Sequence, residues 1–238
     1  MWDLNMVIKV LPMFLFFAVI LGFIFILQIK NKFNYICVDV ILKLIGIILV
    51  FGELSKFVME KGSYSQLPFF LSSIQIFLIC FVAFYKNKQD DIYKTLYLLT
   101  LVLSFVTTFL IIFYPYVIVG STKEPYHDFF TFWVPFSHVL VFFSFGLLTM
   151  FRKISFSLTN WIYSIVITFI TAVFIEVISI TINTSYDGSL GDIIGLKHVT
   201  WWFVGIWVLG ITLISAIVSY FVRLIPSFFI REKPKWRF

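Results

Sequence analysis

The sequence is poor in charged residues and in cysteine. Only 13% of its 238 residues are Asp, Glu, Lys or Arg, whereas a soluble domain carries about 25%. This shortage excludes an ordinary soluble domain, and it also excludes a highly charged disordered chain. Two cysteines, Cys37 and Cys80, are too few for a disulfide-stabilised secreted scaffold. We expect both to be small, buried, unpaired side chains.

Hydrophobic residues dominate instead. They make up 61% of the chain, and 32 residues are Phe, far more than a water-facing surface tolerates. A bilayer core needs roughly 20 consecutive apolar residues per helix. Seven such stretches lie between charged or turn-forming residues, approximately at 10–29, 38–58, 67–85, 95–119, 129–151, 160–183 and 201–224. The sequence therefore predicts an all-α membrane protein, a single bundle of seven transmembrane helices.

The chain shows no internal division. It has no repeat, linker or low-complexity segment, so we expect residues 1–238 to form one seven-helix transmembrane domain. The first stretch is too long for a cleaved signal peptide, and no small-residue cleavage site follows it. It is therefore expected to be the first span.

Lysine and arginine are distributed unevenly between the connections. Twelve lie in or beside the connections after the first, third, fifth and seventh stretches, and five lie in or beside the alternate ones. The positive-inside rule then predicts an N-terminus outside and a cytoplasmic C-terminus. This asymmetry accounts for the net charge of +6, so the charge gives no reason to expect a nucleic-acid partner. For a membrane protein, the expected partners are membrane lipids, with a protein partner in the membrane as a further option.

Charged residues inside the spans are few, and two pairs stand out in the second stretch. Asp39 and Lys43 are spaced i, i+4 near the cytoplasmic end, which predicts a structural ion pair. Glu53 lies on the same helix face nearer the outside, with Lys56 at i+3 as its local partner. Because ionisable residues within a membrane are costly and mark functional sites by default, Glu53 is a candidate binding residue.

Four polar side chains from different stretches are expected at similar depths. At about 1.5 Å per residue, Ser72 and Glu53 lie roughly 8 Å below the outer boundary, while Glu176 lies roughly 10 Å and His138 roughly 13 Å below it. Such a set could line a pocket open to the outer leaflet. The nearby candidate binding residues are Gln66, Ser73, Gln75 and Ser137.

Two interpretations of these residues stay open. In the catalytic one, His138 accepts a proton from the Ser72 hydroxyl while Glu176 or Glu53 orients the imidazole. In the structural one, the serine bonds its own helix or a neighbouring helix, and a His–Glu hydrogen bond joins two helices. The sequence alone does not separate them.

Metal and cofactor sites are not indicated. The three histidines, His127, His138 and His198, lie near acidic residues in the outer half or outside, but their spacing lacks the pattern that makes a zinc site specific. We predict no metal site and no cofactor.

The remaining polar and aromatic residues favour structural roles. Thr100, Ser104 and Thr107 form a stripe that is typical of helix packing. Trp133 and Trp161 lie near opposite boundaries of the predicted membrane, as in an aromatic belt.

Three segments resemble the YwaF-type bacterial integral-membrane family. They are Gly-Glu-Leu-Ser-Lys at 52–56, Gln-Leu-Pro-Phe-Phe-Leu-Ser at 66–72 and Ser-His-Val-Leu at 137–140. That family has about this length and seven spans, with a His-Leu-Pro-Leu-His-Leu-Cys type signature in the third. Here the first signature histidine is replaced by Gln66, the second by Phe70 and the cysteine by Ser72.

The resemblance implies a function. The family is similar to vertebrate multi-pass proteins implicated in acyl transfer onto ether phospholipids, which use a Cys–His pair. It is similar, more distantly, to androgen-regulated intramembrane hydrolases, which use Thr–His. On this resemblance Ser72 occupies the nucleophile position and His138 the base position. A Ser–His pair is chemically workable, since a positioned base can activate a hydroxyl.

Three functions follow as hypotheses. The first is an intramembrane lipid acyltransferase or hydrolase with Ser72, His138 and Glu176 as catalytic residues. The alternative is a non-catalytic membrane subunit that binds a lipid or small solute or docks a partner protein. The third is a proton-coupled transporter. The bias towards Phe, Ile and Lys suggests an AT-rich bacterium, and therefore the plasma membrane.

Overall fold

The described part of the chain is entirely helical. A computed structural model describes residues 10–30, 35–59, 71–113, 129–151, 154–181 and 201–224, and within these ranges it contains seven helices and no strand. The helices are α2 (Leu11–Ile29), α3 (Tyr35–Met59), α4 (Leu71–Phe84), α5 (Asp91–Phe113), α7 (Phe129–Met150), α8 (Leu158–Thr181) and α10 (Trp201–Leu224). Each predicted stretch coincides with one of these helices, so the all-α prediction is confirmed.

Two helices, α5 and α8, begin before the first residue of the predicted apolar stretch, because a polar side chain caps the helix there. α5 begins four residues before the predicted stretch, and the Asp90 carboxylate accepts a hydrogen bond from the backbone N–H of Ile92 at 3.3 Å. α8 begins directly after Ser157, whose hydroxyl accepts a hydrogen bond from the backbone N–H of Asn160 at 3.1 Å. These side chains satisfy N–H groups that have no partner within the helix.

Several helices suit a membrane. Among the described residues, four helices are long and apolar enough to cross one: Leu11–Ile29, Asp91–Phe113, Phe132–Met150 and Leu158–Ile175. Two further apolar segments, Ser73–Phe84 and Val208–Leu224, are shorter. α3 has 25 residues but carries four charged side chains. The long apolar helices are compatible with a membrane location.

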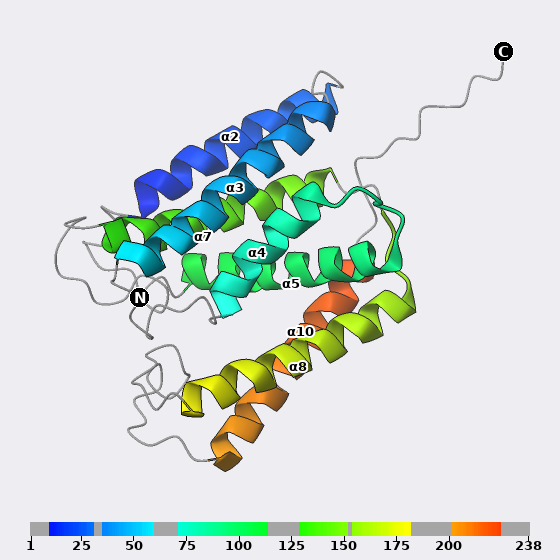
Figure 1. The fold of residues 1–238 in the computed structure, drawn as a ribbon. Helices are drawn as coiled ribbons and strands as arrows, with labels where there is room; N and C mark the ends of the chain where they lie inside the picture. Colours follow the sequence, from blue (N-terminus) through cyan, green and yellow to red (C-terminus); the bar gives the residue numbers. More distant parts are fainter. Residues whose placement is uncertain are drawn as a thin grey trace.

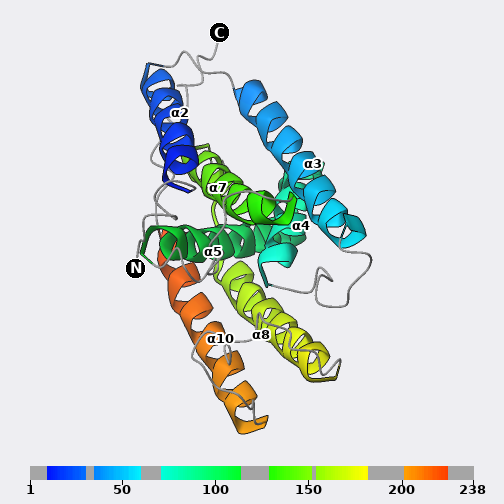
Figure 2. The same cartoon turned by 90° about the vertical axis from the view of Figure 1, so that its left-hand side faces the viewer.

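α5 is the central helix. It packs against α4, α7, α8 and α10, and most of its length is buried inside the protein. Figures 1 and 2 show α2, α3, α4 and α7 on one side of α5, and an antiparallel α8–α10 pair that extends away on the other side. The largest hydrophobic cluster lies mainly between α5 and the first group, and it includes Leu49, Ile79, Leu98 and Leu147, each at most 1% exposed.

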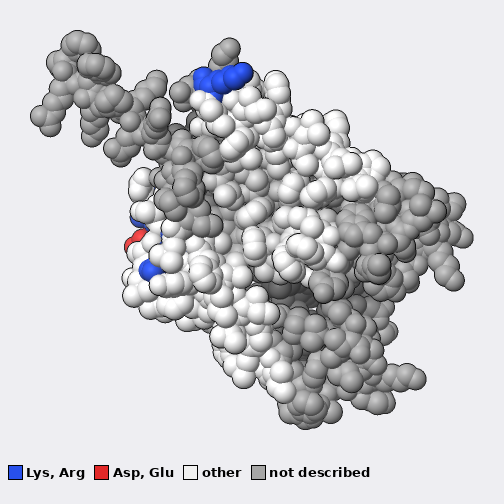
Figure 3. Space-filling model, turned by 180° about the vertical axis from the view of Figure 1, so that it is seen from behind, with Lys and Arg blue, Asp and Glu red and all other residues white. Residues whose placement is uncertain are grey.

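The outer surface of the described residues is strongly apolar. Val19 on α2 is 71% exposed and Phe221 on α10 is 62% exposed. Figure 3 shows a broad face on which nearly all described side chains are uncharged, with the charged ones at its margins. A surface of this kind is unfavourable in water and favourable against acyl chains.

Close contact between α3 and α4 depends on a glycine. A Cβ atom at Gly46 would lie 2.9 Å from the Cα atom of Cys80, which is shorter than real contacts allow. Only glycine therefore lets the two backbones approach this closely, as small residues do in membrane helix pairs.

Both cysteines are free as predicted, but the prediction that both are buried is wrong, because Cys37 is exposed and Cys80 is partly exposed. Apolar residues outnumber interior positions in this chain, so they also cover the outside.

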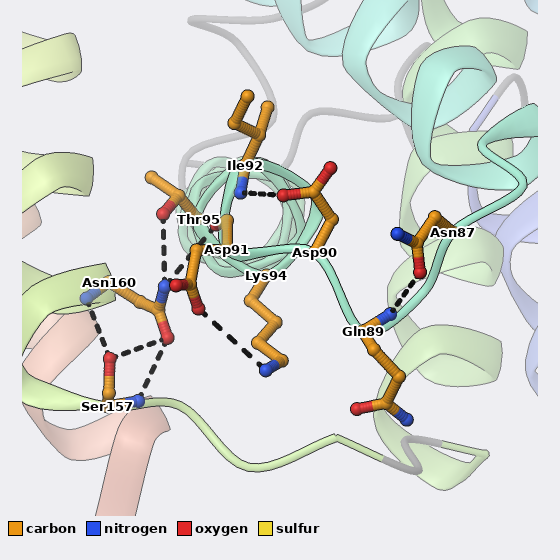
Figure 4. Close-up of polar contacts among 9 residues, drawn as sticks. All are labelled: Asn87, Gln89, Asp90, Asp91, Ile92, Lys94, Thr95, Ser157 and Asn160. Atoms are coloured by element: carbon orange, nitrogen blue, oxygen red, sulfur yellow. Dashed lines mark hydrogen bonds and ion pairs between the residues drawn. The ribbon is translucent and has the colours of Figure 1, made fainter.

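Polar contacts gather at one end of the helices. The Asp39 carboxylate pairs with Lys43 at 2.7 Å and with Lys88 at 2.8 Å, which confirms the predicted i, i+4 ion pair and adds the α4–α5 connection to it. In Figure 4 the Asn160 side chain caps α8 together with Ser157 and also reaches the start of α5. Its Nδ2 donates to the Thr95 hydroxyl and to the Asp91 carbonyl, both at 3.3 Å. This end is consequently held by side-chain bonds between helices.

Candidate functional site

A buried carboxylate joins three helices. Glu53 on α3 is 4% exposed. Its Oε1 accepts hydrogen bonds from Lys56 Nζ at 2.8 Å and from the Ser73 hydroxyl on α4. Its Oε2 accepts one from the indole Nε1 of Trp133 on α7 at 3.3 Å. We call Glu53, Lys56, Ser73 and Trp133 the Glu53 cluster.

The helical spacing of α3 and a single glycine build this cluster. Residues at i and i+3 lie on the same helix face, so Lys56 reaches Glu53 without leaving its own helix. Gly52 directly precedes Glu53, and a Cβ atom there would lie 2.1 Å from Cη2 of Trp133. The missing side chain at position 52 therefore provides the space in which the indole lies against α3.

Trp133 lies inside the protein. It is 4% exposed and belongs to the main hydrophobic cluster, while its depth near a membrane boundary stays a prediction. Its Nε1–H is satisfied by Glu53 inside the protein, as a buried tryptophan requires. Trp133 is thus an interior residue of the site.

The cluster pairs opposite charges. Lys56 is 7% exposed and donates to a carboxylate that is equally buried. A buried charge is tolerated when it is paired and its remaining lone pairs are hydrogen-bonded, and both conditions hold for Glu53. The cluster therefore carries an internal ion pair within an apolar helix group.

His138 lies on α7 one turn after Val134. Its Nδ1 is 2.7 Å from the Val134 carbonyl oxygen, and the Ser137 hydroxyl lies 3.5 Å from the same nitrogen. A carbonyl oxygen only accepts hydrogen bonds, so Nδ1 carries the hydrogen and Nε2 holds the lone pair of the neutral ring. Glu53 and Lys56 are the charged groups whose electrostatic influence reaches this imidazole.

Ser137 is buried and directed to its own helix. Its hydroxyl donates to the Val134 carbonyl at 2.9 Å. This is the common back-bonding of a serine in an apolar helix. The predicted binding role of Ser137 stays a prediction, with its hydrogen used locally.

Gln75 forms a second polar connection, between α4 and α5. Its Nε2 donates to the Ser104 hydroxyl at 3.0 Å, and its Oε1 accepts from the Thr107 hydroxyl at 2.8 Å. The residue is 1% exposed. Ser104 and Thr107 therefore act in helix packing, as their stripe predicted, and both ends of the Gln75 side chain bond within the protein.

The remaining predicted site residues are only partly placed. Ser72 lies on α4 beside Ser73, and Glu176 lies on α8, but their side chains are outside the described part of the structure. Gln66 lies outside the described residues altogether. α8 packs against α5 and α10, whereas α3 packs against α7. Of the two acidic candidates, Glu53 is therefore on the helix that contacts the helix of His138.

The sequence indicated one member of the cluster and not the other. The i, i+3 spacing named Lys56 as the local partner of Glu53, and the ion pair at 2.8 Å confirms it. Trp133 carried no signal of its own, since its partner Glu53 is 80 residues away along the chain.

The described part of the site contains one imidazole, that of His138. Among the described residues, no group of three His, Cys, Asp or Glu side chains could hold a metal ion. The described chemistry consists of a ring nitrogen with an available lone pair, the Glu53–Lys56 ion pair on the neighbouring helix α3, and the Ser73 hydroxyl on α4, which donates to Glu53. This combination can accept a proton from a hydroxyl and stabilise the resulting imidazolium.

Comparison of the chain with protein-family models, with curated proteins and with solved structures finds no match. The resemblance of the three segments to the YwaF-type family therefore stays a prediction.

Proposed function

We propose that this protein is a multi-pass plasma-membrane protein that acts on the acyl chains of lipids by transfer or hydrolysis. In this proposal all seven helices span the membrane, with the N-terminus outside and the C-terminus in the cytoplasm. The long apolar helices and the uneven distribution of lysine and arginine support it. The site then lies in the outer half of the membrane.

The hydrogen bond between His138 Nδ1 and the Val134 carbonyl carries the proposal. It fixes the tautomer in which Nε2 is the basic nitrogen. Within the described part of the chain, Nε2 has no hydrogen-bond partner, and the side chain is only partly buried. A general base needs a nitrogen in this state.

The reaction follows from ordinary acyl-transfer chemistry. The Ser72 oxygen attacks the carbonyl carbon of a lipid ester while Nε2 of His138 takes the hydroxyl proton. The tetrahedral intermediate collapses, the C–O bond to the leaving alcohol breaks, and the imidazolium returns the proton to that alcohol. Water or a second lipid alcohol then attacks the acyl-serine while Nε2 takes its proton, and the imidazolium returns that proton to the Ser72 oxygen as the acyl C–O bond breaks. Atoms and charge balance without a cofactor.

Glu53 supports the imidazolium through its charge in this scheme. Its oxygens are engaged by Lys56, Ser73 and Trp133, so it acts through space rather than by a direct hydrogen bond to the ring. Glu176, the other acidic candidate, lies on α8. We assign the charge-balancing role to Glu53 because α3 packs against α7.

The test compares lipid profiles of cells that carry altered proteins. Ser72→Ala and His138→Ala are each expected to change the same lipid species in the same direction, because each removes one half of the reacting pair. Ser144→Ala is the matched control, since this α7 serine donates to the Leu140 carbonyl of its own helix. Mass spectrometry of total lipids measures the outcome. Unchanged profiles in both variants, at normal protein levels, would rule the reaction out.

A second candidate is a non-catalytic membrane subunit that binds a lipid or small solute or docks a partner. One observation favours it: both Glu53 oxygens and both ends of the Gln75 amide are already hydrogen-bonded within the protein. Such saturation is typical of polar groups that join helices. A serine-reactive fluorophosphonate probe distinguishes the two, because it labels Ser72 only if the hydroxyl is activated.

A further inference from the structure

Arg223, at the end of α10, has no carboxylate partner among the described residues. Arg223 lies in the last turn of α10. Its guanidinium carbon is 5.2 Å from the centroid of the Tyr220 ring, so the group stacks on the aromatic face. Its Nε is buried and has no hydrogen-bond partner.

Most described lysines differ from Arg223. Four of the six pair with a carboxylate at distances from 2.7 to 3.8 Å, namely Lys43, Lys56, Lys88 and Lys94. Within the described ranges Arg223 takes part in no ion pair. A guanidinium whose Nε is shielded from water is costly unless an anion or acceptor lies beside it. The arginine therefore has a donor available for an anion.

The surroundings of Arg223 form an aromatic platform between α8 and α10. The Trp161 ring lies 5.8 Å from the Tyr220 ring in an edge-to-face arrangement. Its Nε1 donates to the Ala216 carbonyl at 3.0 Å, which fixes the indole against α10. Tyr220 is 41% exposed, so part of the platform faces outward, where lipid would lie in a membrane.

Two helix ends of opposite partial charge meet at this place. Trp161 is in the first turn of α8, which is partly positive, and Arg223 is in the last turn of α10, which is partly negative, so Arg223 itself supplies the positive charge. Asp91, at the start of the neighbouring α5, is directed to Lys94 at 3.8 Å. The platform thus combines an arginine with aromatic rings of the type found at membrane interfaces, on the outward side of the α8–α10 pair.

We infer that Arg223, supported by Tyr220 and Trp161, binds the headgroup phosphate of an anionic phospholipid. The planar guanidinium donates in a fork that matches two phosphate oxygens. The exposed part of the Tyr220 ring, beside the guanidinium, contacts the acyl-chain end of the same lipid. In the proposed orientation this is the inner leaflet. The site is separate from the Glu53 cluster and does not depend on the acyl-transfer reaction.

The test uses the purified full-length protein in detergent with equal amounts of phosphatidylglycerol and phosphatidylcholine. Native mass spectrometry counts the lipid that stays bound. We expect the unaltered protein to retain phosphatidylglycerol over phosphatidylcholine, and Arg223→Gln to lower that retention roughly fivefold to tenfold through loss of the charge-assisted bonds. Arg223→Lys is expected to fall between them, because lysine keeps the charge without the fork.

Lys30→Gln is the matched control, since Lys30 is an exposed base just after α2, at the same predicted side of the membrane. It is expected to retain lipid like the unaltered protein. If Arg223→Gln and Arg223→Lys both retain as much phosphatidylglycerol as the unaltered protein, the inference is overturned. Equal binding of the two lipids would also overturn it, as would a loss in Lys30→Gln as large as in Arg223→Gln. Displacement of phosphatidylglycerol by inorganic phosphate alone would show that the site takes free phosphate and would overturn the lipid assignment.

Discussion

The indole of Trp133 lies directly against the backbone of Gly52. A Cβ atom at position 52 would meet three ring atoms at 2.1 to 2.4 Å. The same indole donates to the Oε2 of Glu53 at 3.3 Å. One aromatic ring therefore couples the close approach of α3 and α7 to the position of the buried carboxylate.

Gly52→Ala is expected to destabilise the protein, because the buried indole cannot accept the added methyl group without moving. Overpacking of this kind costs about 1–3 kcal/mol. Thermal unfolding of the purified protein in a single detergent measures the effect. Gly22→Ala is the control, since nothing lies within 4 Å of a Cβ at that position on α2. Equal melting temperatures for Gly52→Ala and the unaltered protein would contradict the contact.

A double variant tests whether the indole causes the cost. Trp133→Phe shortens the ring system and removes the hydrogen bond to Glu53. Adding Gly52→Ala to Trp133→Phe is expected to cost less than Gly52→Ala does alone, since contacting residues are not additive. Additive losses would show that the strain arises elsewhere.

Lys56→Met is expected to be strongly destabilising, by about 3–5 kcal/mol, because it leaves the Glu53 charge buried without its cation. Replacing both partners, in Glu53→Gln with Lys56→Met, removes the charge as well and is expected to recover part of the loss. Chemical or thermal unfolding of the single and double variants measures the order. If the double variant is less stable than Lys56→Met, the pair does not act as a unit.

Gln75→Leu is expected to cost about 0.6–2 kcal/mol, the range for hydrogen bonds between membrane helices. It removes both the donor to Ser104 and the acceptor for Thr107. Ser144→Ala is the control, because Ser144 bonds only within α7. Melting temperatures in detergent compare the two, and a larger loss in Ser144→Ala would argue against Gln75 as a connector.

Asn160→Ala is expected to destabilise more than Ser157→Ala. Ser157→Ala removes one cap of α8, worth about 1 kcal/mol, whereas Asn160→Ala removes the reciprocal cap and both bonds to α5. Thr159→Ala, at an exposed neighbouring position, is the control. Hydrogen exchange at the start of α8 and the melting temperature together check the order. Equal effects would mean that the contact with α5 contributes little.

Much of the fold could be predicted from hydrophobicity. The last predicted stretch matches α10 at both ends, and the fifth matches α7 to within one residue. These helices are bounded by the same apolar-to-polar changes that the sequence shows. The starts of α5 and α8 were less well predicted, because Asp90 and Ser157 extend the helices beyond the apolar pattern.

The site was predictable only in part. Depth along each helix singled out Glu53 and His138, since rise per residue is nearly constant. Which neighbour each side chain meets depends on the rotation of α4 and α7 about their axes. Ser73 meets Glu53, while Gln75, two residues later, faces α5 instead. A single sequence contains no measure of that rotation, and so Trp133 could not be paired with Gly52.

The spacing of the Glu53 cluster along the chain sets an order of events during synthesis. Lys56 is made almost with Glu53 and Ser73 follows 20 residues later, but Trp133 comes 80 residues after the carboxylate. At about 5–20 residues per second, this last donor is synthesised roughly 4–16 s later. The paired α3 and α4 must therefore hold the Glu53–Lys56 ion pair for seconds before the donor to the second carboxylate oxygen exists. Packing of α7 against α3 closes that contact, which makes the late helix the step that completes the cluster.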